Sequence, residues 1–277
     1  MFWVVQKDLY SEYGYTALCN TLERFDIPHT FVKVVPTTSK LLPGDFDTFA
    51  WKDKDIMLAP DAVIDESGHV MVCGATTMIK AAKARGWTPG AFSNADFRYE
   101  SWLEHYGDNL LNPDSVVCRY TDMKPSWEAF FIRPCEDTKS FSGRVMDKTE
   151  FADWQHNVVV LGEQACFATV TPDTMVMASS LKDIYREYRF FVVDGVIVTG
   201  SQYKLGDRVI HDTNIDPDIW AYAQKMVDTW SPDRAFCLDI ALTDLGPKVI
   251  EINCINSAGF YACDVAKWVM AIEDMKF

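Results

Sequence analysis

The sequence predicts an α/β domain over residues 1–112 followed by an α+β domain over residues 113–277. Strand and helix patterns alternate in the first part, whereas hairpins dominate the second. The boundary is placed near Asn112-Pro113-Asp114, after an aromatic and charged segment. With 277 residues, of which 48% are apolar, the chain is long enough to bury two cores.

The first part reads as a small parallel sheet with helices between its strands. Apolar runs of strand length are separated by segments of helical periodicity, and a glycine follows the second helix as its stop. The predicted strands are Phe2–Gln6, His29–Val35 and Val70–Cys73, and the predicted helices are Glu12–Phe25 and Thr76–Arg85.

Two hairpins define the second part. Asp194-Gly195 joins Tyr188–Val193 to Val196–Tyr203, and Asp-Gly is typical of a type I′ turn. The strands Ala235–Leu242 and Lys248–Cys254 form the second hairpin.

Composition limits the function classes. The net charge of −14 disfavours a nucleic-acid partner, although it leaves open an acidic protein that mimics nucleic acid. No apolar run reaches the ~20 residues of a membrane span, and Lys7 and Asp8 interrupt any signal-peptide core. Eight cysteines without CxxC spacing are typical of reduced thiols. We therefore expect a cytoplasmic protein.

The second hairpin carries the strongest chemical signal. Because strand side chains alternate between faces, Asp239 is expected opposite Glu251, with Asn253 one step along on the same side. Oxygen ligands without His or Cys favour Mg²⁺. A solvated acidic surface is the alternative, but apolar Cys237, Ala241, Val249 and Ile255 are expected on that face too, with Phe236, Leu238, Ile240, Ile250 and Ile252 in the core.

Basic residues suited to phosphate occur earlier in the chain. Arg133 ends a predicted strand, and a loop with Lys139 and Gly143 follows. A solvated basic loop is equally compatible with this segment alone. Arg189 is expected opposite Gly200, where a ligand has room to enter, and pairing of Arg189 with Glu187 is the alternative.

Other catalytic motifs are absent from the sequence. Gly195 to Gly200 has Walker-like spacing but lacks the following Lys-Ser or Lys-Thr. The sequence contains no HExxH, no GxSxG and no GxGxxG after a strand, so zinc hydrolysis, serine-triad and dinucleotide chemistry lack support.

The order of these segments resembles the ATP-grasp superfamily, most closely a compact branch from bacteria and their phages that uses arginines beside one lysine. The resemblance covers about Asp114 to Phe277. The segments that carry it are Phe131-Ile132-Arg133-Pro134 to Lys139-Ser140-Phe141-Ser142-Gly143, Met175 to Leu181, Glu187 to Val192 with Asp194-Gly195, Leu238-Asp239-Ile240 and Ile250-Glu251-Ile252-Asn253.

The resemblance implies roles for particular residues. Arg133 and Lys139 would contact the phosphates of ATP, and the link containing Ser180 and Leu181 would border adenine. Arg189 would hold the γ-phosphate or an acyl-phosphate, which makes Arg189 and Lys139 the candidate catalytic residues. Mg²⁺ would be held by Asp239, Glu251 and Asn253.

The implied activity is a carboxylate–amine ligase that forms an amide through an acyl-phosphate, with small-molecule or peptide substrates. Asn256 and Ser257 precede a predicted helix over Ala262–Met275, where they would hold an anion or cap the helix; Tyr203 and Arg208 are further candidate substrate contacts. The alternatives are a non-catalytic acidic partner-binding protein with a relict nucleotide site and a small-molecule kinase. The oligomeric state is left open.

Overall fold

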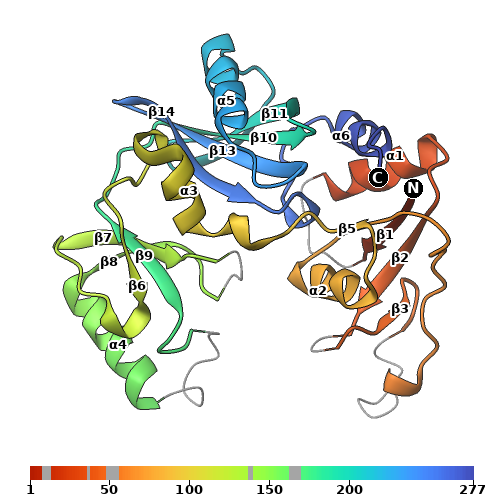
Figure 1. The fold of residues 1–277 in the computed structure, drawn as a ribbon, viewed down its shortest axis with the longest axis horizontal. Coiled ribbons are helices and arrows are strands. Elements are labelled where there is room, and N and C mark those ends of the chain that lie inside the picture. Colours follow the sequence, from red (N-terminus) through yellow and green to blue (C-terminus); the bar gives the residue numbers. More distant parts are fainter. Residues whose placement is uncertain (8–13, 36–37, 48–55, 137–139, 162–169) are drawn as a thin grey trace.

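The computed structural model describes residues 1–7, 14–35, 38–47, 56–136, 140–161 and 170–277. Within these ranges the strands form three sheets, which follow one another along the chain (Figure 1). Figure 1 shows the last sheet at the top, with the lobes of the other two sheets hanging below it on either side. No helix in the described ranges is long and apolar enough to cross a membrane.

The N-terminal sheet has the order β3-β2-β1-β4-β5, and its central strands are parallel as predicted. The strand β3 is antiparallel to β2. Gly86 ends α2 in the left-handed conformation, with φ of 68°. The bounds are Phe2–Gln6 for β1, Tyr15–Arg24 for α1, His29–Val34 for β2, Leu41–Pro43 for β3, Val70–Cys73 for β4, Thr76–Arg85 for α2 and Pro89–Gly90 for β5.

The middle sheet is antiparallel, in the order β6-β9-β7-β8, and packs on one helix, α4. Its core is aromatic, with Phe151 of α4 edge-on to Tyr120 and Phe130. The bounds are Val116–Arg119 for β6, Ala129–Pro134 for β7, Arg144–Asp147 for β8, Lys148–Leu161 for α4 and Met175–Ser179 for β9.

The C-terminal sheet is antiparallel, in the order β12-β11-β10-β13-β14, and contains both predicted hairpins. The bounds are Arg186–Val193 for β10, Val196–Leu205 for β11, Arg208–Asp212 for β12, Pro217–Thr229 for α5, Ala235–Thr243 for β13, Gly246–Asn253 for β14 and Val265–Glu273 for α6. Short 3-10 turns lie at Ile56–Leu58, Ala95–Phe97, Gly107–Asn109, Tyr120–Asp122 and Ile255–Ser257.

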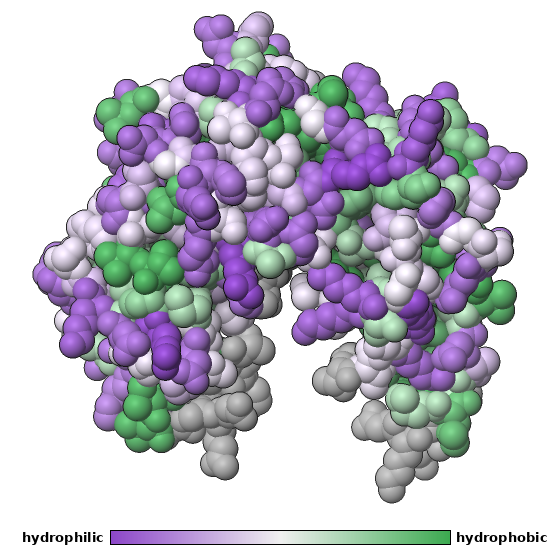
Figure 2. Space-filling model, in the orientation of Figure 1, coloured by the Kyte–Doolittle hydropathy of each residue, from purple (hydrophilic) through white to green (hydrophobic). Residues whose placement is uncertain are grey.

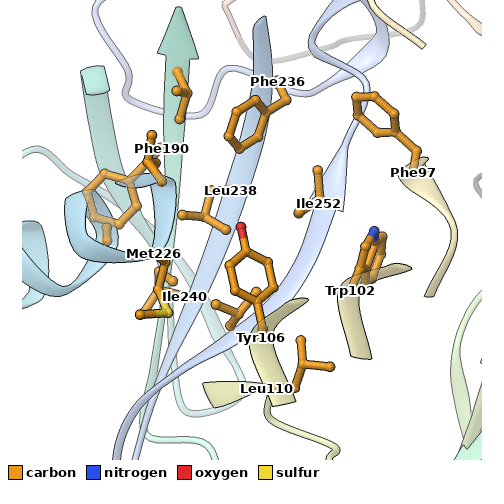
Figure 3. Close-up of a cluster of buried hydrophobic side chains, with 14 of the residues drawn as sticks. Phe97, Trp102, Tyr106, Leu110, Phe190, Met226, Phe236, Leu238, Ile240 and Ile252 are labelled. Carbon is orange, nitrogen blue, oxygen red and sulfur yellow. The ribbon is translucent and has the colours of Figure 1, made fainter. Parts of the chain in front are cut away.

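Both faces of the C-terminal sheet are buried. One face packs on α5 and on α3 (Tyr99–Tyr106), where Trp102 and Tyr106 meet Leu238 and Ile252 (Figure 3). The other face packs on α6 and, through Phe191 and Cys237, on the N-terminal sheet and α1. Because α3 precedes residue 112, the core of this sheet crosses the predicted domain boundary, which stays a prediction.

The surface is mainly hydrophilic on the face in Figure 2, with hydrophobic side chains in small separate groups. This agrees with the net charge of −14. The same view shows a deep hollow between the lobe of the middle sheet and that of the N-terminal sheet.

Two β-bulges correct the predicted strand faces. In the last hairpin Asp239 pairs with Glu251 as predicted, but Ile240 then pairs with Val249, which leaves Ile250 as an extra residue. Val249 is consequently fully buried in the core and Ile250 is only half-buried, the reverse of the prediction.

The other bulge lies between Phe191 and Val192, and it shifts the register of β10 against β11. Arg189 therefore lies opposite Ser201, not Gly200. Gly200 faces Phe190 instead, and a Cβ there would lie 2.6 Å from a ring carbon of Phe190. The space predicted beside Arg189 is thus filled by an aromatic ring, and the prediction was wrong.

Candidate functional site

A cavity of about 790 Å³ lies where the middle sheet meets the C-terminal sheet. This volume is within the range of pockets that hold cofactors. Its walls come from β7 and the loop after it, from the link after β9, from β10, β11 and β14, and from the segment after β14. Of the predicted site residues it is lined by Arg133, Ser180, Leu181, Arg189, Tyr203, Glu251, Asn253 and Ser257.

Arg133, on β7, is held from two sides. Its Nη1 donates to Glu251 Oε2 over 2.7 Å, and its guanidinium lies 5.1 Å from the centre of the Trp102 ring. Trp102 is 1% exposed and comes from α3, about thirty positions earlier in the chain. The aromatic face and the carboxylate together fix the arginine at the cavity wall.

Arg189, on β10, makes a two-pronged ion pair with Asp239 on the neighbouring strand. Nε donates to Oδ1 over 2.8 Å and Nη2 to Oδ2 over 2.6 Å, while Nη1 donates to the Gly259 carbonyl over 3.3 Å. Asp239 is 0% exposed and Arg189 is 7% exposed. Such buried, bidentate pairs are strong because both charges are satisfied in one rigid geometry.

The ionisation of these groups follows from burial and from the arginines. Burial raises the pKa of Asp239 to about 6, although Arg189 opposes the rise. Burial also disfavours the charged form of Glu251, but Arg133, Asn253 and Arg189 outweigh it, and the pKa of Glu251 falls below its usual value. Both carboxylates are therefore ionised at neutral pH, and the two arginines balance them.

The predicted metal ligands do come together. Asp239 lies opposite Glu251, and Asn253 Nδ2 donates to Glu251 Oε1 over 2.9 Å. Carboxylate and amide oxygens suit Mg²⁺. However, both oxygens of Asp239 accept from Arg189, and in the described part of the chain no three His, Cys, Asp or Glu residues are grouped to hold a metal ion. The donor types fit Mg²⁺ once the fork of Arg189 leaves Asp239, so the metal site stays a prediction.

The link after β9 is fixed by Asp114. The backbone N–H of Ser180 donates to Asp114 Oδ2 over 3.2 Å, and Lys182 Nζ donates to Oδ1 over 2.8 Å. Lys182 also contacts the Ser180 hydroxyl and lines the cavity. Ser180 and Leu181 were predicted for this link, but Asp114 and Lys182 were not, because nothing local marks a contact across 68 positions.

The loop after β7 tests the phosphate prediction in part. Lys139 falls outside the described residues, whereas Ser142 and Gly143 line the cavity. A Cβ at Gly143 would lie 2.7 Å from Cζ of Phe131. The glycine is therefore required by the close approach of the Phe131 ring.

The far end of the cavity is built by a bulge at Tyr203. Glu187 pairs with Lys204 and Tyr188 with Gln202, so Tyr203 is an extra residue. Glu187 Oε1 accepts from Lys204 Nζ and Oε2 from the Tyr203 hydroxyl, each over 2.7 Å. The alternative pairing of Arg189 with Glu187 was therefore wrong.

Two predicted substrate contacts lie elsewhere. Arg208 is exposed on β12 and does not line the cavity. Asn256 is 1% exposed and ties the segment after β14 to the N-terminal sheet: Nδ2 donates to the Val72 carbonyl over 2.7 Å, and Oδ1 accepts from Phe92 N over 2.8 Å. Its buried amide has no donor or acceptor left for a substrate.

The predicted helix over Ala262–Met275 begins at Val265. Its cap is Asp264, whose carboxylate accepts from Lys267 N over 3.1 Å, so neither Asn256 nor Ser257 caps it. The first turn therefore lies several residues beyond Ser257, and the anion-binding role predicted for this helix end does not apply.

Comparison with known proteins identifies the fold. Among solved structures the chain resembles an ATP-grasp RimK domain protein from Sphaerobacter thermophilus DSM 20745, with a TM-score of 0.58, 12% identity and coverage of 96% of this chain and 97% of that one. It also resembles an L-amino acid ligase from Bacillus licheniformis (0.56, 13%, 98% and 74%) and a D-alanine–D-alanine ligase from Bacillus anthracis (0.56, 13%, 98% and 96%).

These likenesses show a shared fold, which confirms the predicted fold class. A search of curated proteins found no match. A family model of the ATP-grasp domain, family 3 of the clade named for two arginines and a lysine, matches residues 75–272, well over half of the chain. The chain therefore belongs to the ATP-grasp superfamily, in family 3 of that clade.

Proposed function

We propose that this protein is an ATP- and Mg²⁺-dependent carboxylate–amine ligase. The observation that carries the proposal is the meeting of Arg133, Arg189 and Glu251 at one cavity between two sheets, in a chain of the ATP-grasp family. Two of the structural neighbours are, by name, ligases that join amino acids. The volume of the cavity and its cationic groups suit a nucleoside triphosphate.

The described residues divide into a nucleotide part and a substrate part. Arg133 binds phosphate oxygens, with the predicted Lys139 beside it, and the link with Ser180 and Leu181 borders the base. Tyr203 and Ser257 lie on the other side of Arg189 as substrate contacts. Bound Mg²⁺, held by Glu251, Asn253 and Asp239, supplies positive charge that offsets charge on the transferred phosphoryl group.

The reaction balances as one phosphoryl transfer and one displacement. The substrate carboxylate attacks the γ-phosphorus, ADP leaves, and an acyl-phosphate forms. The amine then attacks the acyl carbon and phosphate leaves with one carboxylate oxygen, while the proton lost by the ammonium goes to solvent. Arg189 faces the phosphoryl group in both steps as a positive partner.

A trapping assay tests the proposal. The protein is mixed with ATP, Mg²⁺, hydroxylamine and pools of amino acids, dipeptides and dicarboxylates. Hydroxylamine replaces the unknown amine, so a ligase yields ADP and a hydroxamate in equal amounts, and only when its carboxylate is present. A stable phosphorylated product would instead identify a kinase. ADP release that never depends on a carboxylate, or no binding of nucleotide, would contradict the proposal and favour the partner-binding protein.

The nucleotide part has its own control. Arg133→Met removes one charge-assisted hydrogen bond, worth about 1.5–3 kcal/mol, and should weaken binding of AMP-PNP about tenfold or more. Arg119→Met removes an exposed arginine whose partner is Asp173 on the surface, and binding should not change. Calorimetric titration measures both.

A further inference from the structure

The fork of Arg189 occupies the centre of the candidate metal site. Two of its nitrogens bind the two oxygens of Asp239, and Nη2 also lies 3.8 Å from Glu251 Oε1. Arg189 lines the cavity but Asp239 does not, and Asp239 is 0% exposed. A cation that enters from the cavity therefore meets the guanidinium before it reaches the Asp239 carboxylate.

Charge gives the same result. Asp239 and Glu251 carry two negative charges, and Arg189 and Arg133 carry two positive charges within hydrogen-bond distance of them. The cluster is thus neutral, and a divalent cation placed in it would be repelled by two arginines at short range in a site of low dielectric. The same cluster without Arg189 has a net negative charge and an uncompensated buried carboxylate.

A polyphosphate changes this balance. Phosphate oxygens offer a guanidinium the same bidentate pairing that a carboxylate offers. Arg189 is also bordered by Tyr203 and Tyr261, which stack 4.6 Å apart and lie 5.7 and 5.1 Å from its guanidinium carbon. The rings stabilise the cation from one side whichever anion it pairs with. Exchange of partner therefore leaves these aromatic contacts in place.

We propose that Arg189 makes the site selective for the metal–triphosphate complex over the free cation. This inference rests on the proposed function. With Arg189 on Asp239, free Mg²⁺ does not bind. When a triphosphate takes the guanidinium, Asp239 becomes a ligand and the metal binds together with the nucleotide. Because binding energies are reciprocal, the metal and the triphosphate each strengthen the binding of the other at this site.

Binding of Mn²⁺, measured by electron paramagnetic resonance, tests the proposal without any turnover. The wild type should show no specific site for Mn²⁺ alone and one site in the presence of AMP-PNP. Arg189→Met should bind Mn²⁺ alone at least about tenfold more tightly than the wild type, because the repulsion is gone and Asp239 is open. The double variant R189M/D239N should lose that site.

A matched control separates this effect from general loss of positive charge. Arg234 forms a similar two-pronged pair with Asp194, with both distances 2.7 Å, but on the surface. Arg234→Met should therefore create no Mn²⁺ site. As a second readout, Mn²⁺ should raise the thermal midpoint of the Arg189→Met variant and leave that of the wild type unchanged, because the metal replaces the missing counter-charge.

The outcomes are distinct. A wild-type protein that binds Mn²⁺ alone at one site, removed by Asp239→Asn, overturns the inference, and so does an Arg189→Met variant that folds but binds Mn²⁺ no better than the wild type. Failure of the wild type to bind Mn²⁺ with AMP-PNP refutes the proposed function itself. If Arg189→Met does not fold, the wild-type measurements still decide.

Discussion

Asp239→Asn is expected to lower the free energy of unfolding by about 3–5 kcal/mol, because it leaves a buried guanidinium without its counter-charge. Arg189 is 7% exposed and gives two hydrogen bonds to Asp239, which no other carboxylate within reach can replace in kind: its next contact, with Glu251, is 3.8 Å long. Urea denaturation of the wild type and the variant, in the absence of nucleotide, measures the loss.

Asp194→Asn is the control for this prediction. Asp194 holds Arg234 with similar geometry, but both side chains are more than 40% exposed, so the same change should cost only about 0–1 kcal/mol. Asp194 has φ of 47°, and asparagine tolerates that conformation well. Equal losses at the two sites would mean that burial does not make the Arg189 pair special, which contradicts our description of the cluster.

Glu251→Gln should reduce ADP release at least about 100-fold, a loss typical of removing one electrostatic partner of a transition state. The change removes a ligand charge from the candidate metal site and the charge that holds Arg133. The amide keeps an oxygen for Arg133 at the same place, so the fold should persist. Glu104→Gln, an exposed position on α3, is the control and should leave ADP release unchanged. Unchanged release by Glu251→Gln would exclude Glu251 from the site.

Local patterns predict the elements of this fold well. The strands β1 and β4 and the helix α2 have the predicted bounds, since an apolar run, a helical period and a stop glycine are all signals within ten or so residues. The Asp194-Gly195 turn is likewise encoded by two residues, both of which have positive φ.

The errors come from bulges. Alternation along a strand predicts which side chains share a face only if each residue has one partner. The bulge after Asp239 exchanges Val249 and Ile250 between the core and the cavity, and the bulge after Phe191 moves Arg189 from Gly200 to Ser201. A bulge depends on how two strands fit together in the sheet, and neither strand shows it alone.

The candidate site divides in the same way. Asp239, Glu251 and Asn253 belong to one hairpin, and Arg133 ends a strand, so their approach follows from spacing and resemblance. The supports of these groups come from distant segments: Trp102 reaches Arg133 from α3, and Asp114 reaches the link after β9. The interdomain role of Asn256 was missed for the same reason. Such contacts depend on how the sheets dock, which short patterns do not contain.

The most direct test is a crystal structure with AMP-PNP and Mg²⁺ bound. Our account predicts the nucleotide in the cavity between the middle and C-terminal sheets, with phosphate oxygens on Arg133 and Arg189 and the metal between the phosphates and Glu251, Asn253 and Asp239. A nucleotide bound elsewhere, or a bound nucleotide with Arg189 still paired to Asp239 and the metal held by other residues, would contradict it.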